Sequence, residues 1–375
     1  MTIVADKPAA VDGVEVTAGV DTHADSHVAA VIDPLGRHLG DRSFAANPAG
    51  YHALGVWIAS FGAVARVGVE GTGAYGAGLA RALSAAGFEV VEVDRPDRKT
   101  RRDHGKSDPI DAYAAARAAA SGRASGTPKS RTGDVESVRA LRVARNGAIR
   151  ARAKALTQLK SLIVTAPAEL RSQLDGLDGA ELIRTCARLR PARDEPAAPS
   201  PHAKRAPRPG RLVDPTAATK RALASIANRI QDLDAELAAL DDDLHVLLTP
   251  LAPTLLALQG VGLDVAGQLL ATAGDNPDRL RSESAFAHLC GVAPIPASSG
   301  KTTRHRLNRG GDRAANAALY RIVLCRLRWD PTTRAYVERR TKQGRSKAEI
   351  IRCLKRYIAR EVYAAIQADF SPPTP

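Results

Sequence analysis

Four carboxylates occupy positions at which an α/β protein places reactive groups. Asp21 lies in the apolar run that contains GVDTH, and Glu70 ends the apolar run VARVGVE. Asp108 and Asp111 are three residues apart in KSDPIDA, at the predicted start of a helix, and so share one helix face. Clustered carboxylates without soft ligands favour Mg²⁺ or Mn²⁺, which prefer oxygen ligands. Two such ions about 4 Å apart can stabilise the attacking and leaving oxygens of a phosphodiester.

A mixed sheet would bring the first two carboxylates together. Three short β-type runs from Val14 predict an antiparallel meander, and a second set of elements follows: a helix at 48–60, a strand at 64–70, a helix at 76–86 and a strand at 88–94. This order describes an α/β mixed-sheet domain with covering helices. If the strand at 64–70 runs parallel to the first strand, Asp21 and Glu70 are neighbours.

The acidic residues also have structural explanations. Asp108 followed by Pro109 suits an N-cap and the first helical position, with Asp111 two positions later. Asp21 is harder to explain in this way, because an unpaired carboxylate inside a sheet needs a partner. A partly exposed turn cluster explains the neighbouring Asp25 and the two histidines beside it, His23 and His27, so we leave these three out of the predicted site.

The charge is strongly positive and segregated. The chain of 375 residues has a net charge of +14 and a pI near 10.0. Residues 95–210 hold 25 basic and 12 acidic residues, and residues 300–360 hold 18 and 4. The alternative explanation is two solvated helical faces, but blocks rich in arginine favour a polyanion such as DNA. Because only 4% of the residues are aromatic, backbone phosphates rather than stacked bases should supply most of the affinity.

The middle of the chain is predicted to be helical. A basic helix is expected at 135–164, and the composition of the Pro-rich segment 191–216 predicts a linker. Leucines and isoleucines then follow an a/d seam at Leu223, Ile226, Ile230, Leu233, Leu237, Leu240, Leu244 and Leu247. Such a seam specifies a coiled coil, either with a second copy as a homodimer or homotetramer, or folded back on the basic helix as a hairpin.

The C-terminal part combines apolar helices with a cationic loop. The apolar arms of residues 255–275 flank Gly260-Val261-Gly262 and resemble a helix-hairpin-helix, which binds phosphates without reading sequence. Residues 295–313 form a polar loop in which Gly310-Gly311-Asp312 predicts a turn into an anion-binding helix N-terminus. The candidate phosphate contacts of the whole chain are Lys99, Arg101, Arg102, Lys106, Lys301, Arg304, Arg306, Arg309 and Arg313. The expected domains are therefore 13–125, 135–250 and 251–362.

Five motifs in a fixed order carry a family resemblance. GVDTH, GVEGTGAYG, DRPDRKTRRDHGKSDPIDA, LQGVG and GVAPIPASSGKTTRHRLNRGGDR together resemble the DEDD transposases of bacterial insertion sequences, relatives of the Piv-type site-specific recombinases. The resemblance spans roughly residues 15–360.

The resemblance implies a two-part active site. The first domain would be a RuvC-like domain of the RNase H fold, in which an acidic tetrad of Asp21, Glu70, Asp108 and Asp111 binds Mg²⁺ or Mn²⁺. The second domain of the family contributes a catalytic serine, which falls on Ser299, with Ser298 as the alternative. Without the resemblance, a flexible polar turn would explain the serine pair better.

The resemblance further implies strand cleavage through a covalent phosphoserine, followed by strand exchange and religation. It also implies a structured noncoding guide RNA, a bridge RNA, whose loops pair with donor and target DNA. Two rival functions remain open, a RuvC-like Holliday-junction endonuclease that uses water as the nucleophile and a non-catalytic nucleic-acid-binding protein. A DnaQ-type exonuclease is disfavoured, because its first Asp and Glu lie two residues apart on one strand, whereas Asp21 and Glu70 come from separate runs.

The remaining features indicate a cytoplasmic bacterial protein that associates with the nucleoid when it acts. No apolar run reaches the roughly 18 residues of a membrane helix, and the N-terminus has no signal-peptide pattern. The four cysteines form no CxxC pair, so neither a disulfide framework nor a zinc site is expected.

Overall fold

Residues 13–93, 107–194, 210–276, 279–298 and 305–371 are described by this computed structural model. The chain divides into two units, which are considered separately. Unit 1 is formed by Met1–Glu136 together with Leu269–Pro375, and unit 2 by Ser137–Gln268.

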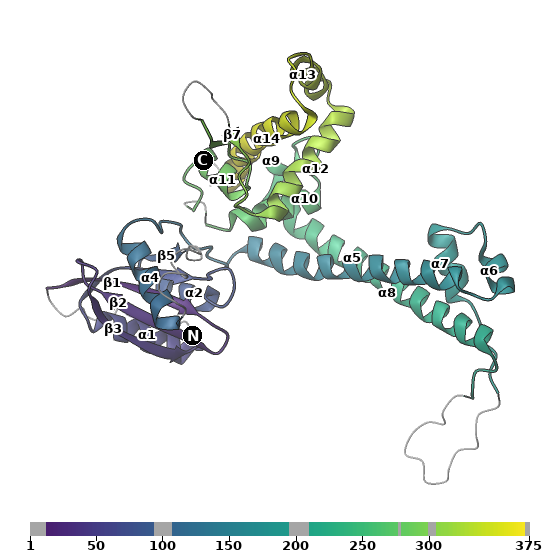
Figure 1. Cartoon of the computed structure of the whole chain (residues 1–375), viewed down its shortest axis with the longest axis horizontal. Helices are drawn as coiled ribbons and strands as arrows, with labels where there is room; N and C mark the ends of the chain where they lie inside the picture. The colour runs from purple at the N-terminus through teal and green to yellow at the C-terminus, as the bar shows by residue number, and fades with distance from the viewer. Residues whose placement is uncertain (1–12, 94–106, 195–209, 277–278, 299–304, 372–375) are drawn as a thin grey trace, which may run out of the picture. The chain divides into compact units, whose positions relative to one another are not determined.

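A five-stranded mixed sheet forms the N-terminal part of unit 1 (Figure 1). Its strands are β1 (Glu15–Thr22), β2 (Ser26–Ile32), β3 (His38–Ala45), β4 (Ala63–Glu70) and β5 (Val90–Val93), in the spatial order β3-β2-β1-β4-β5. Strands β1, β2 and β3 form the antiparallel meander, whereas β4 runs parallel to β1 and β5 runs parallel to β4. The predicted mixed sheet is confirmed.

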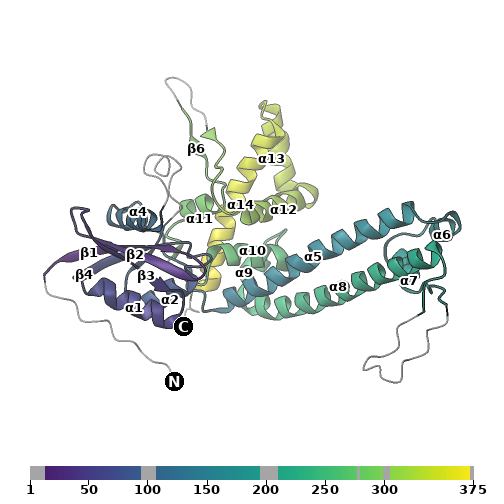
Figure 2. The same ribbon diagram turned by 60° about the horizontal axis from the view of Figure 1, so that its bottom comes forward.

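Helices cover both faces of this sheet. Since successive side chains of a strand point to opposite faces, β2 sends Ala29 and Val31 to one side and Ala30 and Ile32 to the other. The first side packs against α1 (Pro48–Ala59) and α2 (Ala77–Ala85), and the second packs against α4 (Asp108–Ala120). Figure 2 shows α4 on the opposite side of the sheet from α1 and α2.

Two long antiparallel helices form the body of unit 2. The helices of this region are α5 (Asp134–Val164), α6 (Ala168–Leu174), α7 (Gly179–Ala187) and α8 (Pro215–Leu251). Figures 1 and 2 both show α5 and α8 side by side. Arg145 on α5 pairs with Asp241 on α8, and one heptad further along α5 Arg152 pairs with Asp234, one heptad back on α8. The pairing therefore keeps one antiparallel register.

The leucine seam of α8 packs against other helices of the same chain. Leu223 and Ile230 are fully buried in a core with Leu159 of α5 and Ile183 of α7. Of the two arrangements left open by the sequence, the seam thus adopts the fold-back on the basic helix. The middle of the seam is only half-buried, at Leu233, Leu237 and Leu240.

A buried arginine ties α5 to α10 (Leu263–Ala273). Arg142 is 5% exposed and donates from Nη1 to the backbone oxygen and Oδ1 of Asp264, at 2.6 Å each, and from Nη2 to Gln268 Oε1 at 3.0 Å. Gly267 makes this approach possible, because a Cβ at that position would lie 2.9 Å from Arg142 Cδ.

The C-terminal part is mainly helical, as predicted. Its remaining elements are α9 (Pro253–Leu256), α11 (Glu283–Leu289), β6 (Ile295–Pro296), β7 (His305–Arg306), α12 (Arg313–Trp329), α13 (Pro331–Lys342) and α14 (Lys347–Phe370). The helix-hairpin-helix prediction is not confirmed, since α9 before the Gly260 turn has only four residues. The predicted loop at 295–313 contains a short ladder, in which Ile295 pairs with Arg306 and Pro296 with His305. No helix among the described residues is long and apolar enough to span a bilayer.

Candidate active site

The ends of β1 and β4 place two of the predicted carboxylates on neighbouring strands. The parallel register pairs Val20 with Val69, so Asp21 and Glu70 are the next residues along the two strands. The Thr22 hydroxyl donates to the backbone oxygen of Glu70 at 2.9 Å, which joins the two strand ends. The predicted parallel neighbourhood of these strands is confirmed.

Two glycines let α4 lie directly on the sheet. A Cβ at Gly19 would lie 2.1 Å from the Ala116 backbone nitrogen and 2.2 Å from the Ala112 oxygen. A Cβ at Gly68 would lie 2.7 Å from the Ala115 oxygen. Any larger residue at either position would push the helix away. The close approach brings the N-terminus of α4, with Asp108 and Asp111, to the end of β1.

The sequence suggested that Asp108 simply caps its helix, and the N-terminus of α4 does not show this. Ser107, not Asp108, occupies the N-cap position, and no side-chain capping hydrogen bond forms there. Asp108 is the first helical residue, and its half-exposed carboxylate is therefore not used as a cap. Both Asp108 and Asp111 lie in the first turn of the helix.

Asp21, His23 and Asp108 form a group with the geometry of a cation site. Each residue offers one ligand atom, and these atoms all lie within 4.8 Å of one another. His23 Nδ1 lies 3.8 Å from Asp21 Oδ2, and its Nε2 lies 4.0 Å from Asp108 Oδ1. The prediction left His23 out of the site, whereas the structure places its ring between two of the predicted carboxylates. Its position two residues after Asp21, in the turn that follows β1, was the available signal.

The other two predicted carboxylates flank this group without belonging to it. Asp111 is 5% exposed, one helical turn after Asp108, and its charge acts on Asp21. Glu70 is half-buried at the end of β4. The structure thus brings Asp21 and Asp108 into one compact group with His23, and holds Asp111 and Glu70 beside it.

Asp21 is an electrostatically costly carboxylate. Burial raises its pKa above the ordinary value, and the charges of Asp111 and Asp108 raise it further, while His23 lowers it. A divalent cation bound between the carboxylates would remove this cost. The donor set of carboxylate oxygens and one imidazole nitrogen is compatible with Mn²⁺ and, through the oxygens, with Mg²⁺.

Many of the other predicted site residues lie outside the described part of the chain. These residues are Lys99, Arg101, Arg102, Lys106, Ser299, Lys301 and Arg304. Ser298 follows β6 by two residues and is described, as are Arg306 on β7, Arg309 and Arg313, which are all exposed.

The predicted turn does lead into α12, but the N-terminus of this helix already carries a carboxylate. The Asp312 carboxylate occupies the N-cap and accepts hydrogen bonds from the backbone nitrogens of Ala314 and Ala315, at 2.8 and 3.2 Å. Its other oxygen accepts from the Thr272 hydroxyl at 2.6 Å. The helix amides are thus satisfied by a carboxylate of the chain itself, which would repel a phosphate.

Comparisons with known proteins give the same family twice. A DEDD transposase family model of the IS110 group, described as "Transposase", matches residues 18–166. A second model, "Transposase IS116/IS110/IS902 family", matches residues 252–338. The first match contains Asp21, Glu70, Asp108 and Asp111, and the second contains the serine pair.

Two curated relatives match the chain over shorter stretches. The chain is 27% identical over 146 residues to "Insertion element IS110 uncharacterized 43.6 kDa protein" of Streptomyces coelicolor, which covers 38% of this chain and 36% of the relative. It is 26% identical over 137 residues to "Insertion element IS900 uncharacterized 42 kDa protein" of Mycobacterium paratuberculosis, which covers 36% and 34%. The chain thus spans about a third of the length of these relatives.

Proposed function

Because the chain belongs to the IS110 group of DEDD transposases, we propose that it is a DNA transposase and site-specific recombinase that cleaves and rejoins DNA strands. The observation that carries this proposal is the meeting of Asp21 and Asp108 around His23, beside Asp111 and Glu70. A carboxylate cluster of this kind at the edge of a mixed sheet suits an RNase H-like, RuvC-like domain that holds divalent cations.

In the proposed site, Asp21, Glu70, Asp108 and Asp111 hold Mg²⁺ or Mn²⁺. The bound cations supply Lewis-acid stabilisation of the charge that develops on the phosphodiester oxygens. Asp21 and Asp108 would hold the cations from a strand and a helix whose close approach Gly19 permits. His23 adds a ligand or orients the carboxylates beside it.

Ser299, with Ser298 as the alternative, is the proposed nucleophile. Its Oγ forms a bond to the scissile phosphorus, the bond to one ester oxygen breaks, and that oxygen leaves as a strand hydroxyl with the proton that the serine gives up. A strand hydroxyl then attacks the phosphoserine, which restores the serine and rejoins DNA. Two supports are the second family match over residues 252–338 and the cationic surroundings of the β6–β7 hairpin.

A structured guide RNA is part of the proposal. It is supported by the resemblance to the family and by the excess of arginine over aromatic residues, which suits recognition of backbone and shape. Base pairing of this RNA with donor and target DNA would then supply the sequence specificity.

The test follows a plasmid that carries the gene with several hundred flanking nucleotides in bacterial cells. The wild-type chain should produce joined element ends, detected by amplification across the junction, and Asp21→Asn should produce none. Deleting the noncoding flank while keeping the element ends should also abolish the product. Unchanged junction yield in Asp21→Asn would contradict the proposed function.

The purified chain separates a recombinase from a junction endonuclease. With labelled junction DNA and Mg²⁺, a recombinase should form a protein–DNA adduct that survives denaturation, and Ser299→Ala should lose it while Ser298→Ala keeps it. An endonuclease would cut equally well in both variants without any adduct. A non-catalytic binding protein would be indifferent to Asp21→Asn in both assays.

A further inference from the structure

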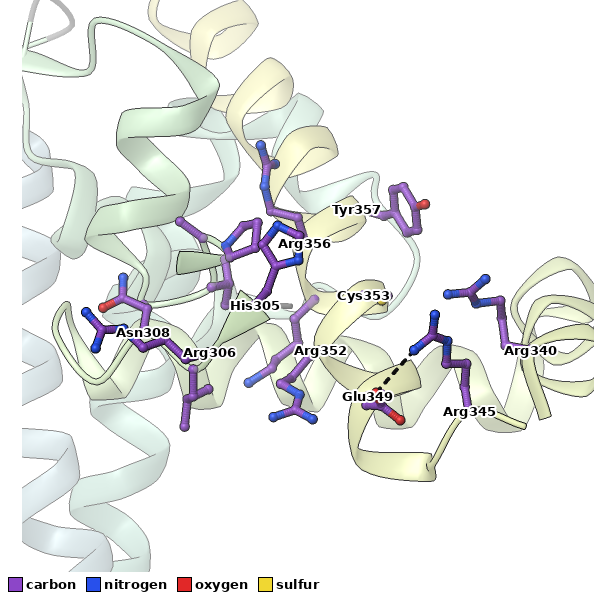
Figure 3. A pocket seen from close by; sticks show the side chains of 16 residues that line it. His305, Arg306, Asn308, Arg340, Arg345, Glu349, Arg352, Cys353, Arg356 and Tyr357 are labelled. Carbon is purple, nitrogen blue, oxygen red and sulfur yellow. Dashed lines mark ion pairs between the residues drawn. The ribbon is translucent and has the colours of Figure 1, made fainter. Parts of the chain in front are cut away.

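A cationic pocket of about 760 Å³ lies in the C-terminal part of unit 1, between the β6–β7 hairpin and helices α13 and α14 (Figure 3). Of the described residues that line it, six are cationic and one is a carboxylate, Glu349. The six cationic residues are Arg306, Arg340, Arg345, Arg352, Lys355 and Arg356. They come from the hairpin strand β7 and from the helical segment around the α13–α14 turn. A pocket of this volume is in the range of about 300–1,000 Å³ typical of ligand sites.

The carboxylate in this pocket neutralises little of the positive charge. Glu349 accepts hydrogen bonds from the Ser346 nitrogen and hydroxyl at 3.0 and 2.9 Å, as the capping box of α14. It also lies 3.5 Å from Arg345, the ion pair drawn in Figure 3. Arg356 pairs with Glu283, which it shares with Arg360.

Two of the cationic residues, Lys355 and Arg356, are charged at an electrostatic cost. Burial lowers the pKa of Lys355, and the charge of Arg352 lowers it further. Burial also lowers the pKa of Arg356, with the charge of Arg360 as the second cause. Like charges held together in this way bind an anion favourably, because the anion relieves their mutual repulsion. The pocket is therefore organised for a ligand with several negative charges.

An aromatic side chain at the pocket indicates which kind of polyanion fits. Tyr357 is 48% exposed, and its ring forms a T-shaped pair with the ring of Tyr336, with the ring centroids 5.8 Å apart. An exposed ring held in place by a second ring offers a face on which a nucleobase can stack. A base in a duplex is already stacked on both sides, so this contact requires an unpaired strand.

The pocket is also continuous with the hairpin that carries the serine pair. Arg306 in β7 lies opposite Ile295 in β6, and Ser298 follows β6 by two residues. A strand bound by Arg306 would therefore contact the hairpin on whose β6 side Ser298 lies. This placement favours DNA, the strand to be cut, over RNA.

We propose that this pocket binds the backbone of a single DNA strand, with the side chains of Arg306 and Arg352 on phosphates and one base stacked on Tyr357. The choice of DNA rests on the proposed function. The pocket would hold the strand next to the cleavage point while its partner strand is displaced.

The proposal is tested by titrating the full-length chain with labelled single-stranded DNA, single-stranded RNA of the same sequence and duplex DNA at several salt concentrations. The double variant Arg306→Gln/Arg352→Gln should reduce the slope of log affinity against log salt on single-stranded DNA by about 1.4, because each lost phosphate contact contributes about 0.7. Arg334→Gln is the matched control, since it removes an equally exposed arginine from α13 outside the pocket and should change the slope by less than about 0.7.

Tyr357 tests the stacking contact separately. Tyr357→Ala should weaken binding of single-stranded DNA about tenfold, whereas Tyr357→Phe keeps the ring and should bind like the wild-type chain. Neither variant should change the affinity for duplex DNA. Circular dichroism of each variant checks that the helices remain folded.

Three results would overturn the proposal. They are an unchanged salt slope in the double arginine variant, a loss confined to RNA, and equal losses on duplex and single-stranded DNA in Tyr357→Ala. The catalytic proposal is judged independently, because Asp21→Asn should lose cleavage and keep this binding. If the wild-type chain binds single-stranded DNA through the pocket but never cleaves, the proposed function fails and the binding site stands.

Discussion

Asp21 and Asp108 present carboxylate oxygens to opposite nitrogens of the same imidazole, at 3.8 Å from His23 Nδ1 and 4.0 Å from His23 Nε2. Asp21 comes from the end of a central strand and Asp108 from the first turn of a helix. The arrangement has no structural purpose that we can identify, since Asp108 does not cap its helix. A divalent cation bound between these carboxylates would offset the electrostatic cost of Asp21.

Asp21 gives the chain a specific dependence of stability on pH. Because the pKa of Asp21 is raised in the folded state, its contribution favours folding while the carboxyl is protonated and is lost as pH rises through that raised pKa. In the absence of divalent cations, the melting temperature of the Asp21→Asn variant should therefore rise relative to that of the wild-type chain as the pH increases from about 4 to 7. Differential scanning calorimetry measures it. Adding Mn²⁺ should reverse the difference, and a pH-independent difference would contradict the electrostatic account.

Gly19 is predicted to control the distance between α4 and β1. Gly19→Ala places a Cβ against the backbone of Ala116 and Ala112, so we expect a loss of about 3 kcal/mol in the free energy of unfolding together with weaker Mn²⁺ binding. The matched control is Gly147→Ala in α5, where a Cβ meets no atom within 4 Å and should stabilise the helix by about 0.5–1 kcal/mol. Urea denaturation measures both. Equal effects of the two variants would exclude the close approach as the cause.

Removing the buried Arg142 of unit 2 should lower the free energy of unfolding more than removing a partly exposed arginine. Arg142→Ala removes the cation whose guanidinium meets Asp264 and Gln268, and we expect it to cost about 3 kcal/mol of unfolding free energy. Arg152→Ala breaks a partly exposed pair with Asp234 and should cost no more than about 1 kcal/mol. Chemical denaturation compares the two, and a larger loss for Arg152→Ala would show that the packing around Arg142 is misassigned.

The hairpin of α5 and α8 is predicted to mediate self-association. Val143 is 62% exposed and Val246 70% exposed on these helices, so both apolar side chains are accessible to a second copy. Val143→Glu/Val246→Glu should shift the mass measured by light scattering from a dimer or tetramer towards the monomer. Val14→Glu, at an exposed position before β1, should leave the mass unchanged. A wild-type chain that is already monomeric at micromolar concentration would refute this assembly.

The sequence predicted most of the helices and strands, but few of the contacts between them. Short β-type runs separated by turn signals predicted β1 to β3, and the a/d seam predicted the helix α8, because these patterns follow from the burial of apolar residues. The partner of the leucine seam was not determined, since an a/d pattern is equally satisfied by a second copy or by α5. The N-cap of α4 was misplaced by one residue, because Ser107 and Asp108 both suit the position.

For the candidate site too, the sequence predicted residue types better than the contacts between distant residues. The acidic residues could be found by type and spacing, and the parallel pairing of β1 and β4 put Asp21 beside Glu70 as expected. The sequence places His23 two residues after Asp21, but its distance to Asp108 depends on how closely α4 approaches the sheet at Gly19 and Gly68.

The central claim is that the acids around Asp21 hold divalent cations, and a titration of the full-length chain with Mn²⁺ followed by electron paramagnetic resonance tests it most directly. The wild-type chain should bind Mn²⁺, and Asp21→Asn/Asp108→Asn should bind it about a hundredfold more weakly. Asp25→Asn, in the exposed turn between β1 and β2, serves as the control and should bind like the wild-type chain. Undiminished Mn²⁺ binding in the double variant would contradict the account.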